Sequence, residues 1–155
     1  MTTRSSMALS PEETSRPTVE AGGVEFPVLT FESGLPGFPD QHRFAVVPLG
    51  PEFEPFCRMT SLDTEGLQFV VAPPGVFFDD YTIEVDEASA ERLGVSDAAD
   101  VVVLVIVTLA EPPAVPTANL LGPIVVNRLT WSAMQVVQRN SVLPVAAALQ
   151  RRSVH

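Results

Sequence analysis

Val101-Val-Val-Leu-Val-Ile-Val-Thr-Leu109 is the stretch of this sequence that decides its fold. Seven of its nine residues are β-branched, and such side chains are restricted in a helix but pack well on a pleated sheet. The run is much shorter than the roughly 20 apolar residues that a membrane-spanning helix needs. Because both faces of the strand would be apolar, the pattern predicts a central strand that is covered on both sides.

Shorter apolar runs on either side of this strand are separated by Gly, Pro and polar turns. The 15 Pro and 9 Gly among 155 residues leave little room for long helices. We therefore predict an all-β, mainly antiparallel fold, either a small barrel-like or a sandwich domain, with one or two short helices. The other expected strands are residues 24–31, 44–49, 56–62, 67–72, 120–127 and 130–138.

One short helix is expected between residues 86 and 94. Asp86 can accept backbone N–H bonds as the N-cap, Glu87 suits the positive end of the helix, and Gly94 can close it. Ser96 can cap a second, shorter turn that runs to Asp100.

The chain length predicts a single folded domain. Residues 1–18 are polar and are expected to form a disordered leader, followed by a β domain over residues 19–145. Residues 146–155 form a C-terminal tail, and the sequence after Pro144 favours a frayed helical turn.

The net charge of −10 limits the possible partners. Binding to nucleic acid needs clustered cations that neutralise phosphates, and here the 9 basic residues are scattered among 19 acidic ones. Direct binding to nucleic acid or to anionic membranes is therefore disfavoured. The single cysteine and the absence of an apolar signal segment in the first twenty residues predict a cytoplasmic protein.

The sequence offers little for catalysis or for a cofactor. Cys57 and His42 could form a nucleophile and base pair if the fold brought them together. The favoured interpretation is a buried, unreactive Cys57 and a solvated His42, because nothing near Cys57 would lower its pKa. We therefore expect no enzyme activity, no cofactor and no metal site.

Two features around residue 80 could serve an interaction. Asp79, Asp80, Glu84, Asp86 and Glu87 form an acidic cluster, which is favoured as a solvated surface and alternatively docks a basic partner. Beside it, Phe77 and Phe78 are adjacent and should point to opposite sides of the chain. A purely structural role for this pair is favoured, and the alternative is an interaction anchor, since aromatic residues dominate binding hot spots.

Three motifs, in this order and spacing, resemble a known family. They are Phe31-x-x-Gly-Leu-Pro-Gly-Phe38, Pro73-x-x-x-Phe-Phe-x-x-Tyr81 and Thr117-Ala-Asn-Leu-x-x-Pro-Ile-Val-x-Asn127. Together they are similar to the flagellar assembly factor FliW family, over about residues 19–145. The resemblance implies a non-enzymatic, barrel-like protein that binds the carbon storage regulator CsrA, a small basic RNA-binding dimer.

The resemblance also implies what this binding does. The regulator represses translation of flagellin mRNA, and the antagonist relieves that repression by docking away from the RNA-binding surface. Flagellin is implied as a second partner that excludes the first. A flagellin-specific chaperone without regulator binding is the alternative. The charge of −10 suits a basic partner, because complementary fields raise encounter rates.

The motif positions are assigned two kinds of role. Structural roles in turns and caps are expected for Gly34, Pro36, Gly37, Thr117 and Asn119. Partner binding is expected from an apolar anchor inside an acidic rim, made by Phe77, Phe78, Asp79, Asp80 and Tyr81. Asn127 and Gln135, two polar residues between apolar neighbours, are further candidates for binding.

Overall fold

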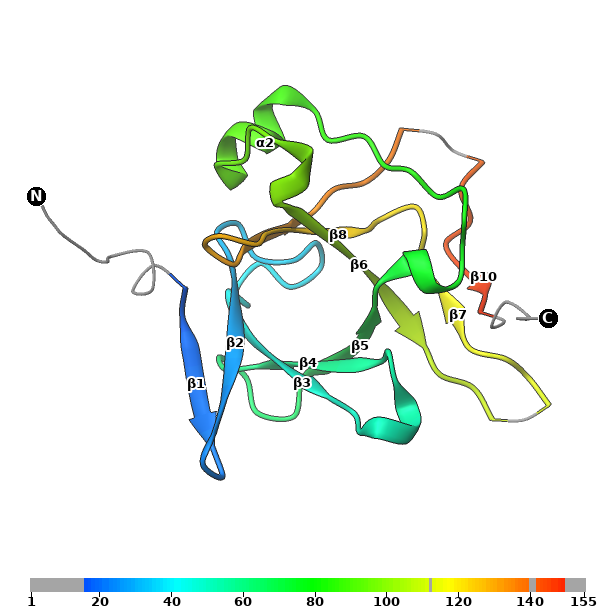
Figure 1. The fold of residues 1–155 in the computed structure, drawn as a ribbon, viewed down its shortest axis with the longest axis horizontal. Helices are drawn as coiled ribbons and strands as arrows, with labels where there is room; N and C mark the ends of the chain where they lie inside the picture. The colour runs from blue at the N-terminus through cyan, green and yellow to red at the C-terminus, as the bar shows by residue number, and fades with distance from the viewer. Residues whose placement is uncertain (1–15, 112, 140–141, 150–155) are drawn as a thin grey trace, which may run out of the picture.

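The computed structural model describes residues 16–111, 113–139 and 142–149, and strands dominate them (Figure 1). The strands are β1 (Thr18–Ala21), β2 (Val24–Phe31), β3 (Arg43–Pro48), β4 (Cys57–Ser61), β5 (Gln68–Ala72), β6 (Val101–Thr108), β7 (Thr117–Ala118), β8 (Ile124–Asn127), β9 (Ser132–Gln135) and β10 (Ala147–Ala148). The helical elements of these segments are α2 (Glu87–Leu93) and the short 3-10 turns η2 (Pro51–Phe53), η3 (Pro74–Val76) and η4 (Ala98–Asp100). The prediction of an all-β fold with short helices is confirmed.

The strands close into a barrel, seen end-on in Figure 1. Strands β2, β3, β4, β5 and β6 pair in sequence order, each antiparallel to the next. β6 then pairs with β8 and β8 with β9, again antiparallel. β9 returns to β2 in parallel, with Thr30 opposite Ser132 and Phe31 opposite Ala133. The short strands β1, β7 and β10 extend the sheet outside this ring.

The barrel interior is filled by large apolar side chains from nearly every strand of the ring. Phe31 and Phe44 are fully buried there, with their rings edge-to-face at a centroid distance of 5.5 Å. Met59, Val71 and Ile124 complete the centre of this core. Because alternate residues of a strand face opposite sides, the same strands present a second set of side chains outward.

The outward face of β6 is covered by two separate clusters, which we call the outer cores. The first outer core contains Val105 and Val107 and packs against Phe77, Leu120 and Leu149. The second contains Leu93, Val125 and Val136, with Val101 packed at its edge. β6 is therefore the central strand that its sequence predicts, although its cover is incomplete.

Helix α2 begins and ends where the sequence predicts. The Asp86 carboxylate accepts a hydrogen bond from the Ser89 backbone N–H at 2.8 Å, and Gly94 ends the helix at a φ of 77°. The following turn, η4, differs from expectation, because its N-cap is Asp97 and not Ser96. The Asp97 carboxylate accepts from the Ala99 N–H at 3.0 Å, which places the cap one residue later.

Two strands near the C-terminal end are shorter than predicted. The run expected over residues 120–127 pairs as β8 only from Ile124, because Asn119 folds the chain into a turn before it. The run expected over residues 130–138 becomes β9 only from Ser132. Trp131 precedes it at a φ of 63°, a left-handed conformation that a strand cannot contain.

The edges of the domain also differ from expectation. Thr18, the last residue of the expected leader, is already the first residue of β1. The helical turn predicted after Pro144 is wrong: Ala147 and Ala148 form β10 against β7, and Leu149 is buried at 5% exposure. Burial of Leu149 in the first outer core favours the strand over a helical turn. Residues 1–15 and 150–155 of the expected leader and tail lie outside the described residues.

Candidate functional site

The aromatic loop, residues 73–81, leaves the end of β5 and crosses the outer face of the barrel. Phe77 is only 8% exposed and stacks on Phe56 at a centroid distance of 5.8 Å. Phe78 is half-buried against the same outer core, 6.4 Å from the Phe77 ring. Phe77 therefore has the structural role that the sequence favoured, and Phe78 retains exposed surface.

The polar residues of the aromatic loop divide into fixed and exposed groups. The Tyr81 hydroxyl donates a hydrogen bond to the Leu120 carbonyl oxygen at 2.6 Å, and burial raises the pKa of Tyr81 to about 12. Tyr81 thus anchors the end of the loop to the barrel. Asp79 and Asp80 are exposed at its turn. The loop presents carboxylates around a half-buried ring.

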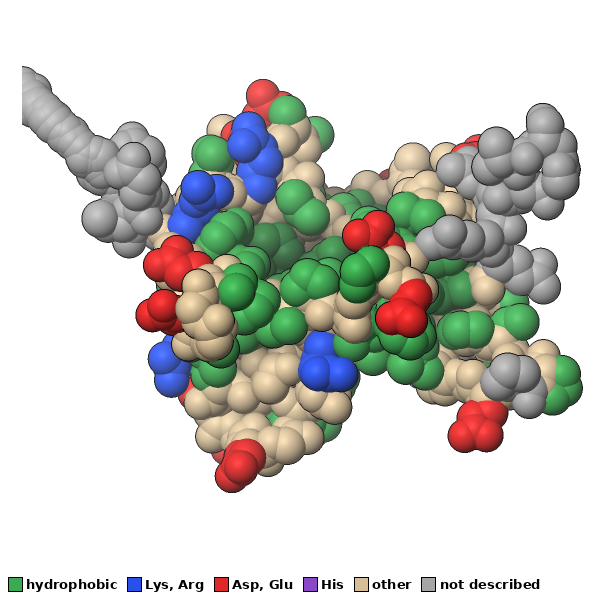
Figure 2. All heavy atoms as spheres, turned by 60° about the horizontal axis from the view of Figure 1, so that its bottom comes forward, with side chains coloured by type: hydrophobic (Ala, Val, Ile, Leu, Met, Phe, Trp, Pro, Cys, Tyr) green, Lys and Arg blue, Asp and Glu red, His purple; other side chains and the backbone are tan. Residues whose placement is uncertain are grey.

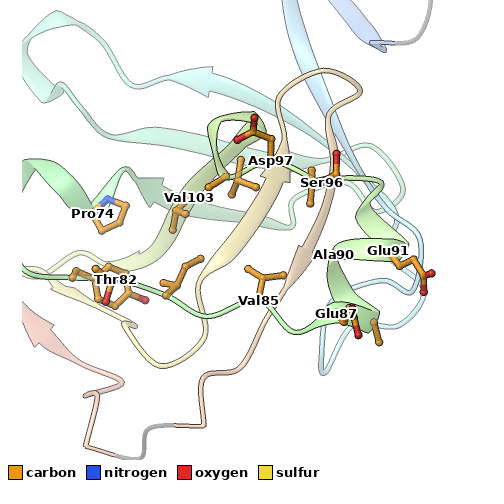
Figure 3. A pocket seen from close by; sticks show the side chains of 15 residues that line it. Pro74, Thr82, Val85, Glu87, Ala90, Glu91, Ser96, Asp97 and Val103 are labelled. Atoms are coloured by element: carbon orange, nitrogen blue, oxygen red, sulfur yellow. The ribbon is translucent and has the colours of Figure 1, made fainter.

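A groove adjoins the aromatic loop, between residues 81–85, α2, η4 and β6 (Figure 3). We call it the α2 groove; its volume is about 1190 Å³. Five half-buried aliphatic side chains line it, from the loop, the helix end and the strand: Ile83, Val85, Val95, Val101 and Val103. Sequence reasoning missed this groove, because the run of Val residues in β6 does not show which of them is left partly uncovered.

The charged residues of the α2 groove all have the same sign. Among the described residues that line it, the ionisable acids are Glu87, Glu91 and Asp97, all exposed, and none is an Arg or a His. A different face of the molecule also gathers apolar side chains, but there Arg as well as Asp and Glu side chains border them (Figure 2). The α2 groove therefore combines an apolar lining with a purely acidic rim.

Asn127 and Gln135 act inside the fold. Asn127 is 3% exposed; its side-chain amide donates to the Leu93 carbonyl oxygen at 2.9 Å and accepts from the Leu129 N–H at 2.9 Å. It thus ties the end of α2 to the turn after β8. The Gln135 amide donates to the Gly122 carbonyl oxygen at 2.7 Å. Asn127 is therefore buried, whereas Gln135 is half-buried.

Cys57 and His42 lie at opposite ends of the β3–β4 pair. Cys57 is opposite Pro48, whereas the His42 backbone N–H donates to the Asp63 carboxylate at 2.7 Å beyond the other end. From His42 to Pro48 the chain advances six residues, or about 20 Å at strand spacing. Burial also raises the pKa of the Cys57 thiol, which disfavours the reactive thiolate. The two side chains do not form a dyad.

The described part of the chain contains neither a cluster of metal ligands nor a membrane-spanning helix. There, no three His, Cys, Asp or Glu side chains come close enough to hold a metal ion together. Within the same residues, no helix has both the length and the apolar character to cross a membrane.

A family model described as "FliW protein" matches residues 15–149, which is most of the chain. The chain belongs to the FliW family. It is 44% identical over 114 residues to the flagellar assembly factor FliW of Bacillus subtilis (strain 168), covering 74% of this chain and 79% of that protein. It is 39% identical over 119 residues to the flagellar assembly factor FliW of Treponema pallidum (strain Nichols), covering 77% of this chain and 75% of the relative.

The fold agrees with this family. A crystal structure of the flagellar assembly factor FliW superposes with a TM-score of 0.73 at 33% sequence identity, covering 82% of this chain and 88% of that one. The resemblance inferred from the sequence is thus confirmed, and so is its barrel-like fold. A role as a flagellar assembly factor follows from the family.

The FliW motif residues mainly shape the backbone. Gly34 and Gly37 have φ values of 73° and 85°, in the turn where Leu35 and Phe38 exchange backbone hydrogen bonds. The Asn119 side-chain oxygen accepts from the N–H groups of Leu121 and Gly122, both at 3.0 Å, which fixes the chain before β8. Of the motif residues, Tyr81 borders the α2 groove, whereas the turns that contain Gly34 and Asn119 lie outside it.

Proposed function

We propose that this FliW-family protein binds the carbon storage regulator CsrA and so relieves repression of flagellin translation. The observation that carries the proposal is the aromatic loop, where the half-buried Phe78 ring is followed by the exposed carboxylates of Asp79 and Asp80, on a flagellar assembly factor. A small basic regulator is the complementary partner for such a surface. The protein would act in the cytoplasm, where that regulator meets mRNA.

Flagellin is the proposed second partner, and its binding excludes the regulator. The protein then works by occupancy, and the free flagellin concentration decides how much antagonist remains for the regulator. The outcome of such a competition depends on the difference in binding free energy, with about 1.4 kcal/mol for each tenfold change in affinity. No catalytic step is needed.

Charge supports the proposed pairing with a basic protein. The net charge of −10 and the carboxylates at residues 79, 80, 87, 91 and 97 give a negative field on this side of the molecule. Such a field raises the rate of encounter with a basic protein and repels RNA phosphates. The protein would thus reach the regulator without competing for its RNA directly.

The aromatic loop is the proposed anchor of this binding. We assign the contact to Phe78, Tyr81 and the two carboxylates of Asp79 and Asp80, with Phe77 supporting them from below. The half-buried Phe78 ring would supply the apolar contact that slows dissociation, and the carboxylates would steer approach.

Replacing Phe78 by Ala tests this anchor. We predict that Phe78→Ala weakens regulator binding by more than about 1 kcal/mol, because an aromatic hot-spot contact is lost. Isothermal titration calorimetry measures the affinity, and circular dichroism confirms the fold. Phe53→Ala is the control, since Phe53 is 53% exposed on η2, outside the loop. Equal affinities for both variants and the unmodified protein would remove Phe78 from the site.

The function itself is tested by titrating the purified protein into the regulator of the same organism, and then repeating the titration with flagellin present. Tight binding that flagellin abolishes is the expected result. Binding to flagellin alone would support a flagellin-specific chaperone instead. Binding to neither would refute both functions.

A further inference from the structure

The cover of β6 has a gap at one residue. The side chains of Val101, Val103, Val105 and Val107 share the outward face of this strand. Val105 and Val107 are buried in the first outer core, and Val101 packs at the edge of the second. Val103 lies between the two outer cores, belongs to neither, and is only half-buried.

The α2 groove is the space above this gap. Residues 82–85 pass beside β6 without covering Val103, and α2 closes the far end (Figure 3). A volume of about 1190 Å³ is large enough for several side chains of a peptide segment. A segment seated there would join the two outer cores into one continuous apolar layer.

Among the described residues, no Arg side chain lines the groove itself, although Arg139 lies beside residues 82–85 at its outer edge. The Arg92 guanidinium, on α2, donates to the Ser33 hydroxyl at 2.9 Å, which directs it away from the groove. Arg128, next to η4, is paired with Asp100 at 3.1 Å and donates to the Ala99 carbonyl oxygen. The carboxylates of Glu87, Glu91 and Asp97 therefore face solvent together.

We infer that the α2 groove docks an apolar segment of the basic regulator, with aliphatic or aromatic side chains seated on Val103 and flanking Arg or Lys side chains at the acidic rim. This inference rests on the proposed function and adds a second, separate contact to the aromatic loop. The apolar contact slows dissociation, and the acidic rim favours a cationic segment over a neutral or acidic one.

The matched pair Val103→Gln and Val102→Gln tests the apolar contact. Val102 is the adjacent residue of the same strand, is 40% exposed, and points to the opposite face. Calorimetry with the full chain and the regulator should show about tenfold weaker binding for Val103→Gln, the size of a hot-spot loss. Val102→Gln should bind within about twofold of the unmodified protein, as residues outside a hot spot do.

The double variant Glu91→Gln, Asp97→Asn tests the rim. Asn keeps the oxygen that accepts the Ala99 N–H, so η4 retains its cap. The expected result is a few-fold weaker binding and a reduced dependence on salt, because rim charges act on encounter. The double variant Glu52→Gln, Glu65→Gln removes two exposed carboxylates, in η2 and in the β4–β5 turn; it is the charge-matched control and should leave both unchanged.

The outcomes separate this inference from the proposed function. If the unmodified protein binds no regulator, the proposed function fails. If it binds, and folded Val103→Gln and the rim variant bind equally well, the groove inference is overturned and the function stands. If Val103→Gln loses flagellin binding but still binds the regulator, the groove inference is also overturned, because the groove would then hold flagellin and not the regulator. If Val103→Gln fails to fold, the rim variant tests the groove inference alone, since both of its substitutions are at exposed side chains.

Discussion

Tyr81 is the single tyrosine of the chain, so its ionisation can be followed without interference. Burial raises its pKa to about 12, whereas an unfolded chain has its tyrosine near 10. We predict one near-ultraviolet absorbance transition close to pH 12 in the folded protein, moving to about 10 in urea. A folded-state transition near 10 would show that the hydroxyl is open to solvent.

The same shift has a consequence for stability. Above about pH 10 the unfolded chain loses the Tyr81 proton before the folded protein does. The contribution of protonated Tyr81 to the free energy of unfolding is therefore fully present below pH 10 and is lost as the pH rises toward about 12. Tyr81→Phe should remove this dependence and cost about 1 kcal/mol at neutral pH, because the bond to the Leu120 carbonyl is lost. Urea unfolding at several pH values measures both effects.

A substitution at Asn127 can show whether this side chain stabilises the fold or binds a partner. Replacing it by Ala leaves the Leu93 carbonyl oxygen and the Leu129 N–H without their partner. We expect Asn127→Ala to lower the free energy of unfolding by about 1–3 kcal/mol, the cost of unsatisfied buried groups. Regulator affinity of the folded fraction should stay unchanged. A stable variant with lost binding would instead place Asn127 in the interface.

Two glycines of one turn allow a comparison at the level of an element. A Cβ at Gly34 would lie 2.5 Å from the Pro39 carbonyl oxygen, whereas a Cβ at Gly37 would meet nothing within 4 Å. Both residues have positive φ, so Gly37→Ala should cost about 1–2 kcal/mol in backbone strain. Gly34→Ala should cost more, because the turn must also move. Urea unfolding of both variants measures the difference, and equal costs would mean that the turn yields freely.

Some elements could be predicted because their signals are local. Helix α2 has its capping carboxylate at Asp86 and its left-handed glycine at Gly94 within a few residues of its own sequence. The strands β2 to β6 are apolar runs bounded by Gly, Pro or polar turns, and their bounds differ from expectation by one residue or less. The sequence does not distinguish a barrel from a sandwich, because closure of the ring depends on pairings between distant segments.

The remaining elements depend on tertiary contacts that no local pattern records. β10 forms because β7 offers an edge and the first outer core has room for Leu149. The candidate site follows the same rule. Val103 and Val105 are alike in sequence, yet only Val105 is covered by the aromatic loop's core, so the groove could not be located in advance. The aromatic loop itself could be named, but not which of its two phenylalanines is exposed.

At the scale of the whole molecule, charge should govern association. Binding to the regulator is predicted to weaken as salt rises, because surface charges are screened over about 8 Å at physiological ionic strength. The loss should appear mainly in the association rate, measured by stopped flow, since an acidic rim steers encounter. The dissociation rate, set by the apolar contacts, should change little. An association rate independent of salt would argue against a steering role for the acidic surface.

The parallel pairing of β2 with β9 has a consequence for how the protein is made. A ribosome delivers β2 about one hundred residues before β9, and β8 only just earlier than β9. Until both strands emerge, the inner face of the nascent sheet from β2 to β6, which carries Phe31, Phe44 and Met59, is exposed to solvent. The growing chain therefore carries an unclosed apolar surface through most of its synthesis, a stage at which cellular chaperones bind their clients.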